Sequence, residues 1–263
     1  MPTVESHGWY RLAPFRWSRE ERVLRRKEAI GDSIFDLEIR AEGGALQVRG
    51  APMSDELRDR IARMFQLHLD LAEFHALTRK SPAHEWVART GFGRLLCGTT
   101  IWEDAVKIIA TTNTMWSQTV RMVELLVAKC GREGAFPAQA DVLQFTPDEL
   151  QRDCRLGYRA KTIHALASVD LDAIDRTQPT EPLFRSYLKL PGIGPYGAAH
   201  LLAMDGRHDH IAVDTEFRSY VRNTYHAGRK VSDATMVRRY AKWGRWKYLA
   251  YWAEHWGERG SED

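Results

Sequence analysis

The sequence has little cysteine and no long apolar run. Its 263 residues include three cysteines, Cys97, Cys130 and Cys154. They are too few and too far apart for a disulfide framework, a zinc ribbon or a four-cysteine iron–sulfur cluster. No stretch approaches the roughly 18 consecutive apolar residues that span a bilayer, and the first residues lack the charged-then-apolar pattern of a secretory signal. We therefore expect buried or unreactive thiols, no iron–sulfur cluster, no membrane partner, and a cytoplasmic protein associated with the nucleoid.

Neither charge sign dominates, because 38 Lys and Arg residues stand against 35 Asp and Glu residues, for a formal net charge of +3. The chain is 44% hydrophobic, which excludes disorder as its main state and leaves room for two or three subdomains. The basic residues are concentrated between Arg218 and Lys247, where Asp233 is the single acid. Such a segment attracts a polyanion, since neutralising phosphates releases counterions. It could equally be a solvated face whose charges pair with acids elsewhere.

Hydrophobic periodicity divides the chain near residue 53. Apolar and polar residues alternate over 35–40 and again over 46–49, on either side of two glycines, which predicts an antiparallel hairpin with one buried face. From Asp55 onward the spacing is helical almost to the end. We therefore expect an α+β fold, mostly α, with a small N-terminal antiparallel β-sheet. The β-rich domain would span 1–53 and the helical domain 54–263.

Three helix limits follow from capping chemistry. Thr146 to Glu149 form a capping box, with proline at the first helical position. Gly131 is expected to end the helix that contains Val120 to Val127, because glycine accepts the left-handed conformation that follows many helices. Pro195 can begin the helix that contains Ala198 to Leu202.

The stretch Leu-Pro-Gly-Ile-Gly, from Leu190 to Gly194, lies between two helical segments. Its glycines let the backbone turn tightly and approach a ligand, and the N-terminus of the next helix attracts a phosphate. A plain turn between helices would account for the same residues. Asp214 lies 20 residues after Gly194, behind an apolar stretch. It could be an ordinary N-cap, or a carboxylate that stabilises the charge on a sugar as a glycosidic bond breaks.

Together these features resemble the helix-hairpin-helix (HhH-GPD) DNA glycosylase superfamily. The hairpin, its spacing to Asp214 and the string Val213-Asp214-Thr215 are similar to those of the family. The segment Ala110 to Trp116 resembles one that, in the 8-oxoguanine glycosylase branch, carries an asparagine into the gap left by a flipped base. Leu156 to Lys161 matches a Gly-Tyr-Arg-Ala-Lys string of that branch and of the alkylpurine (3-methyladenine) glycosylases.

The likeness covers residues from about 55 to the end, and the β-rich N-terminus is similar to an extra domain that both branches share. It implies two helical subdomains that flank a DNA-binding cleft, with the helix-hairpin-helix motif at about 183–204. The implied partner is damaged double-stranded DNA, bound by a monomer.

The resemblance also implies a role for each matching residue. Asp214 would be the catalytic carboxylate. Asn113 would fill the gap opposite the extruded base, and Met115 or Trp116 would act as a wedge unless they pack in the core. The residues implied to contact the DNA backbone are Leu190, Pro191, Gly192, Ile193 and Gly194. Those implied to line the base pocket are Tyr196, His200, Tyr248 and Trp252. His200 could instead be a satisfied core histidine, and Trp252 could be helical core. The carbonyls of Leu188, Leu190 and Ile193 could hold Na⁺ or K⁺ against a phosphate, and no other cofactor is implied.

Two residues depart from the family pattern. Members that also nick the strand carry a lysine at the position of Tyr196, and a phenol cannot form the Schiff base that this reaction requires. Tyr196 therefore implies a monofunctional enzyme that uses water as the nucleophile. Glu216 lies where many relatives have a histidine or a similar group near a phosphate, and an acid there would repel DNA unless it is paired.

These implications lead to one expected function and two alternatives. We expect a DNA glycosylase that flips and excises a base and leaves an abasic site. An alkylated base is the first choice, because aromatic walls stack on a flipped base and attract a cationic one. An oxidised purine is the alternative that Asn113 and residues 157–161 favour. A helix-hairpin-helix module that only binds DNA is an alternative from another class.

Overall fold

The computed structural model describes residues 2–259, so residue 1 and residues 260–263, at the outer ends of the two expected domains, lie outside the described residues. Four strands form one antiparallel sheet in the order β1-β2-β3-β4. They are β1 (Arg16–Ser18), β2 (Val23–Ile30), β3 (Ser33–Glu42) and β4 (Ala45–Arg49). Ile39 lies opposite both Leu24 and Val48. The hairpin predicted over 35–40 and 46–49 is therefore confirmed as β3 and β4.

Strand β2 has an inward face that carries charge. Leu24, Arg26 and Glu28, at every second position of the strand, are buried, although two of them are charged. The strand therefore lacks the alternation of apolar and polar residues that predicts a half-buried strand. Arg26 lies 2.6 Å from Glu28 and 3.1 Å from Glu103 of α4, and Lys107 lies 2.6 Å from Glu103. These side chains are at most 3% exposed. A buried ionic network thus joins the sheet to the helical body.

Helices form most of the remaining described chain. They are α1 (Asp55–Met64), α2 (Ala72–Thr78), α3 (Glu85–Thr90), α4 (Ile101–Thr111), α5 (Trp116–Cys130), α6 (Gln139–Val142), α7 (Pro147–Asp153), α8 (Arg159–Ala167), α9 (Thr180–Tyr187), α10 (Pro195–Met204), α11 (Thr215–His226), α12 (Asp233–Arg238) and α13 (Lys247–Arg259). Short 3₁₀ helices are η1 (Gly8–Arg11), η2 (Pro82–His84), η3 (Arg132–Gly134) and η4 (Ala241–Trp246). The predicted class, mostly α with a small N-terminal antiparallel sheet, is confirmed.

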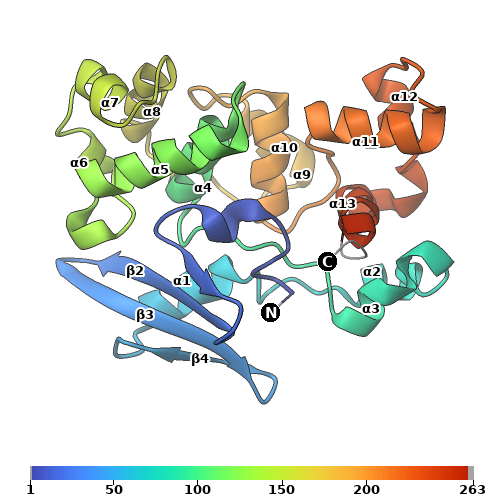
Figure 1. Ribbon diagram of the computed structural model, residues 1–263, viewed down its shortest axis with the longest axis horizontal. Helices are drawn as coiled ribbons and strands as arrows, with labels where there is room; N and C mark the ends of the chain where they lie inside the picture. The colour runs from blue at the N-terminus through green and yellow to red at the C-terminus, as the bar shows by residue number, and fades with distance from the viewer. Residues whose placement is uncertain (1, 260–263) are drawn as a thin grey trace.

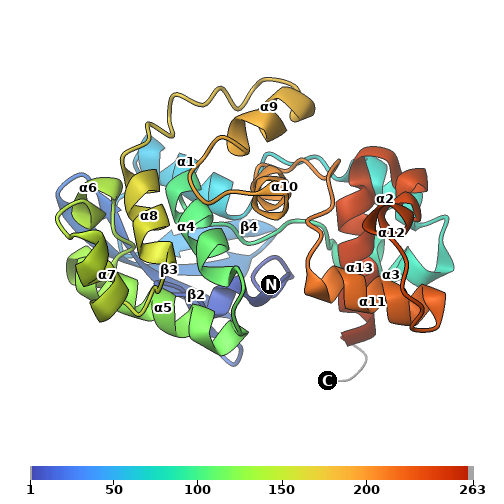
Figure 2. The same ribbon diagram turned by 90° about the horizontal axis from the view of Figure 1, so that it is seen from above.

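Helix α10 lies between two groups of helices (Figures 1 and 2). Helices α4 to α8 form the group on the side of the sheet, and α2, α3 and α11 to α13 form the other. Helix α10 packs directly against α4 and α9. The loop that joins α9 to α10 is the hairpin predicted from the Leu-Pro-Gly-Ile-Gly stretch. Among the described residues, no helix combines the length and apolar character needed to span a membrane.

Two of the predicted helix limits are confirmed, and the third is correct for a different reason. Thr146 and Glu149 form the reciprocal capping box, and Pro195 begins α10. Gly131 follows α5, but its φ is −76°, so it is not left-handed as we expected. A Cβ on Gly131 would lie 2.1 Å from the Ala135 carbonyl oxygen and 2.5 Å from that of Val127. Lack of space, and not backbone conformation, therefore requires glycine there.

The segment before β1 runs toward α10 and α13 and contains η1. The Trp252 Nε1 of α13 donates to the Ser6 carbonyl at 2.7 Å. His7 Nε2 lies 2.9 Å from the Leu96 carbonyl oxygen. Part of the region expected to be β-rich is therefore built into the helical body.

Candidate active site

The two glycines of the hairpin have different roles. Gly192 has a φ of +75°, and a Cβ there would lie 2.1 Å from Thr162 Cγ2 of α8. Both conformation and space therefore require glycine at this position. Gly194 has a φ of −90°, and a Cβ there would have no heavy atom of the described residues within 4 Å. Since Gly194 is exposed, this part of the turn is open to a ligand.

Gly194 is also the N-cap of α10. Within residues 2–259, no side chain caps this helix N-terminus, so its first N–H groups remain available to an anion. Leu190 and Ile193 are buried and Pro191 is half-buried. Leu190 and Ile193 could therefore contact DNA only through their backbone, while their side chains anchor the hairpin in the core.

The carbonyls expected to hold a cation lie along this same turn. Leu188 is the C-cap of α9, and the Leu190 carbonyl accepts a hydrogen bond from the Ile193 N–H at 3.1 Å. A carbonyl oxygen has a second lone pair, so this bond leaves Leu190 able to bind a monovalent cation. Over the described part of the chain, no three His, Cys, Asp or Glu side chains cluster as metal ligands.

Asp214 is the N-cap of α11. Its Oδ1 accepts a hydrogen bond from the Phe217 N–H at 2.7 Å, so the ordinary role considered from the sequence is present. Burial raises the pKa of the Asp214 carboxyl, and the nearby Glu216 raises it further, whereas the Phe217 N–H and His255 lower it. The side chain is half-buried. Its backbone contacts to Phe217 and Glu216 hold the carboxylate at the start of α11.

The four residues expected to line a base pocket come together. The ring centroids of Tyr196 and His200, both on α10, are 5.7 Å apart. His200 lies 6.3 Å from Tyr248 of α13, which stacks on Trp252 at 6.1 Å. Burial raises the pKa of Tyr196 to about 12, and the charge of Asp214 adds to this increase. An electrostatic interaction therefore links the candidate carboxylate to the candidate pocket.

These rings differ in accessibility. Tyr248 is only 2% exposed, whereas Tyr196, His200 and Trp252 are half-buried. Tyr248 therefore forms the back of the cluster, and the other three rings provide its accessible surface. A base entering between them would have to displace some of the packing seen here.

His200 is not a satisfied core histidine. Both of its ring nitrogens are buried, and neither has a hydrogen-bond partner among the described residues. Burial lowers the pKa of its imidazole to about 4, so the ring is neutral at physiological pH. Buried polar atoms without partners are uncommon in native proteins and often mark functional sites.

Two further members of this cluster are not predictable from the sequence. Trp9 of η1 stacks on His200 with centroids 5.9 Å apart and planes at 14°, and His7 lies 6.4 Å from the same ring. Both come from the segment before the first strand. The run Gly8-Trp9-Tyr10 is the only local signal, and it contains nothing that would connect it to α10.

The segments around Asn113 and Tyr158 are held together by one arginine. The buried Arg159 guanidinium donates to the carbonyls of Thr112 and Asn113, the latter at 3.3 Å. Asn113 is exposed with a φ of +47°, and its Nδ2 donates to the Tyr158 hydroxyl at 3.4 Å. The exposed Tyr158 ring thus lies next to Asn113. The matching strings at 110–116 and 156–161 therefore build one structural unit.

The two candidate wedges differ in their surroundings. Met115 is 69% exposed, which excludes the core position considered from the sequence. Trp116 is half-buried and packs on Gly8, where an added Cβ would lie 2.8 Å from its ring. Packing is therefore the present role of Trp116, and Met115 is the better placed side chain to enter a duplex.

Solved structures similar to this chain cover almost its whole length. The structure of MBOgg1 in complex with low affinity DNA ligand aligns at a TM-score of 0.77 and 20% identity, over 98% of this chain and 92% of that one. The 3-methyladenine DNA-glycosylase from Archaeoglobus fulgidus aligns at 0.77 and 18% identity, over 96% and 92%. The 8-oxoguanine glycosylase/lyase of Clostridium acetobutylicum, in complex with dsDNA containing cytosine opposite to 8-oxoG, aligns at 0.73 and 17% identity, over 98% and 93%.

The chain has the fold of these DNA glycosylases. The resemblance predicted from the motifs is thus confirmed at the level of fold. The sequence itself matches no protein-family model and no curated protein.

The basic segment of this glycosylase fold is partly paired. Arg218 forms an ion pair with Asp233 at 2.8 Å, and Arg245 contacts Glu73 of α2 at 2.5 Å. Other basic residues of the segment are exposed at the surface, and they are Arg229, Lys230, Arg238, Arg239 and Lys242. Arg245 therefore meets an acid from elsewhere, whereas Arg218 meets the segment's own acid. Binding of a polyanion by the exposed residues stays a prediction.

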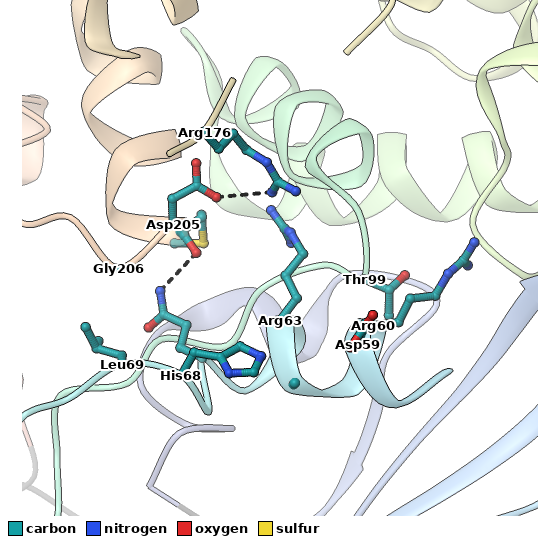
Figure 3. Close-up of a pocket in the computed structure, with 12 residues that line it drawn as sticks. Asp59, Arg60, Arg63, His68, Leu69, Thr99, Arg176, Asp205 and Gly206 are labelled. Carbon is teal, nitrogen blue, oxygen red and sulfur yellow. Dashed lines mark hydrogen bonds and ion pairs between the residues drawn. The ribbon is translucent and has the colours of Figure 1, made fainter. Parts of the chain in front are cut away.

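A pocket of about 460 Å³ lies at the other end of α10 (Figure 3). Arg63 of α1 and Arg176 line it, together with Asp205 and Gly206, which follow α10. The helix has ten residues, so this pocket lies about 15 Å from the hairpin. It is therefore separate from the site that contains Asp214.

Proposed function

We propose that this protein is a monofunctional DNA N-glycosylase that excises a damaged base from duplex DNA and leaves an abasic site. The observation that carries the proposal is the position of Asp214. The charge of this carboxylate acts on Tyr196 and Tyr248 in the aromatic cluster and raises the pKa of both, and Tyr196 belongs to the first turn of the uncapped helix α10. An acid, an aromatic cluster and an anion site in this arrangement suit a nucleotide turned out of its helix.

Each group has a defined task in this proposal. The exposed turn at Gly194 and the N–H groups of α10 hold a phosphate. The carbonyls of Leu188, Leu190 and Ile193 would hold a monovalent cation, which adds positive charge beside that phosphate. Asn113 and Met115 occupy the space that the extruded base leaves. Asp214 stabilises the positive charge that develops on the sugar and orients water for attack.

An alkylated base is the substrate that the rings favour. Electron-rich aromatic faces attract a cationic base, and the neutral His200 adds no positive charge to oppose it. A cationic base is also already activated as a leaving group, so the site needs no strong general acid. The similar structure from Archaeoglobus fulgidus is a 3-methyladenine DNA-glycosylase.

An oxidised purine is a second candidate, and a specific observation favours it. Arg159 holds Asn113 and the exposed Tyr158 side by side, a unit formed by the strings that resemble the 8-oxoguanine branch. The similar Clostridium acetobutylicum protein is an 8-oxoguanine glycosylase/lyase. That protein is also a lyase, whereas the phenol of Tyr196 cannot form an imine.

Base release from duplexes with alkylated, oxidised or deaminated lesions tests the proposal. We expect release of an alkylated base, with strand breaks only after alkali. Asp214→Asn is expected to lower the release rate by about 10²–10³, the usual effect of losing a key electrostatic contact. Asparagine is as good an N-cap as aspartate, so the fold should be kept.

Three results would contradict parts of the proposal. A covalent adduct trapped with borohydride would show lyase chemistry. Release of oxidised purines alone would favour the second candidate. DNA binding without release of any base, and unchanged or tighter in Asp214→Asn, would identify a module that only binds DNA.

A further inference from the structure

A second acid lies beside Asp214 at the start of α11. Glu216 is on the first turn of this helix, and its side chain is 48% exposed. Its Oε1 lies 3.3 Å from Nε2 of His255 on α13. The contact has the distance of an ion pair, although His255 Nε2 makes no hydrogen bond within the described residues. Two carboxylates and one imidazole thus meet where α11 begins.

His255 is fixed in place by aromatic rings. It is 6% exposed and stacks on Tyr251 with centroids 5.6 Å apart, and it contacts Tyr220 of α11 at 5.0 Å. Its ring is also 5.7 Å from Trp252, a wall of the candidate base pocket. The imidazole therefore connects the pocket helix α13 to the first turn of α11.

The charges of this cluster act on Asp214 in opposite directions. The carboxylate of Glu216 disfavours a second negative charge nearby, and it would also repel a DNA phosphate. His255 acts in the opposite direction and lowers the pKa of Asp214. Among the side chains that the structure describes, the ionisable groups around His255 include Asp214, Glu216 and Tyr220 from α11 and Tyr251 from its own helix.

We propose that Glu216 and His255 are a positioning pair, which holds the first turn of α11 against α13 and so sets the position and the electrostatic surroundings of Asp214 beside the sugar. The catalytic benefit of this pair rests on the proposed glycosylase function. The effect of the pair on Asp214 can be measured in a protein that shows no activity. Neither residue needs to touch the substrate.

The test is a titration of the Asp214 carboxyl group by ¹³C NMR in the full-length protein. We expect the pKa of Asp214 to rise in His255→Gln and to fall in Glu216→Gln, because His255 lowers it and Glu216 raises it in the native protein. The double variant should lie between them. Glu216→Gln changes an exposed side chain, so it remains informative even if His255→Gln folds poorly.

The kinetic counterpart is the pH profile of kcat for base release. Its acid limb should move to higher pH in His255→Gln and to lower pH in Glu216→Gln, with KM for DNA changing less than kcat. A displacement of one pH unit corresponds to a tenfold change in rate on that limb. Exchanging the two residues, in Glu216→His with His255→Glu, should recover activity relative to His255→Glu alone.

A matched control is available on α9. Glu181 lies 3.1 Å from His210, another carboxylate–imidazole contact, and Glu181→Gln should leave the titration of Asp214 unchanged. Shifts in the same direction for both single variants, or no shift in either, would overturn the pairing. If the wild-type protein releases no base, the proposed function fails, while the NMR titration still decides the pair.

Discussion

One backbone hydrogen bond explains why Asp214 supports two interpretations from the sequence. The bond from the Phe217 N–H makes it the N-cap of α11, and the same bond directs the carboxylate toward the start of that helix. The capping role and the proposed catalytic role are therefore compatible. Capping fixes the orientation of the side chain, and burial makes its charge costly.

At the residue scale, this cost predicts that Asp214→Asn stabilises the fold at neutral pH. The folded-state pKa of Asp214 is raised, so ionisation is harder in the folded chain than in the unfolded one. This loss of folding stability is absent below the pKa that Asp214 has in the unfolded chain. It develops as pH rises through the pKa that Asp214 has in the folded chain. Urea unfolding at pH 3 and pH 7 measures it, and a stability gain that is equal at both pH values would contradict the prediction.

At the scale of elements, the hairpin between α9 and α10 separates a structural glycine from an open one. Gly192 is left-handed and packed against Thr162, whereas Gly194 has ordinary backbone angles and free space around it. The sequence motif does not distinguish the two glycines. The fold requires Gly192 for the backbone conformation of the turn, whereas Gly194 leaves space for a ligand.

Alanine substitutions test this difference as a matched pair. Gly192→Ala should cost roughly 2–4 kcal/mol of unfolding free energy, because it adds left-handed strain and a clash with a stiff β-branched side chain. Gly194→Ala should cost under about 1 kcal/mol but weaken DNA binding roughly tenfold. Urea denaturation and fluorescence anisotropy measure the two effects. Equal stability losses in the two variants would refute the assignment.

At the scale of the whole molecule, the sheet is joined to the helices by buried charge. Burial alone would raise the pKa of Glu103, but Arg26 and Lys107 outweigh burial and lower it to about 2. Breaking such a pair leaves buried charges without partners, which costs about 3–5 kcal/mol. Glu103→Gln should therefore destabilise the protein by that amount at pH 7.

The pH dependence of this loss has a definite sign. Because the folded pKa of Glu103 is depressed, its contribution is full above an unfolded pKa of about 4.5 and disappears as pH falls toward about 2. The wild-type protein and Glu103→Gln should thus converge in stability over that range. Glu38→Gln is the control, since its pair with Arg25 is exposed to solvent and should change the stability much less than Glu103→Gln does. A constant difference between wild type and Glu103→Gln down to pH 2 would contradict the prediction.

Local features of the sequence were sufficient for the hairpin β3–β4, the capping box at Thr146, the start of α10 and the turn at Gly192. Each depends on backbone angles, capping groups or alternation within a few residues, so neighbouring side chains determine it. Strand β2 lies within the predicted β-rich region but was not predicted as a separate strand, because its buried residues Arg26 and Glu28 are charged. Glu103 of α4 and Arg60 of α1 supply charges that pair with them.

Only the tertiary structure decided what surrounds the candidate site. The contact between Ser6 and Trp252 joins residues 246 positions apart, and the same folding brings Trp9 onto His200 and His255 to Glu216. No periodicity or cap encodes such pairs, because their energy comes from burial of surfaces that meet only after the helices have packed. The sequence by itself predicted the candidate carboxylate and its turn. Packing determined which rings and charges accompany them.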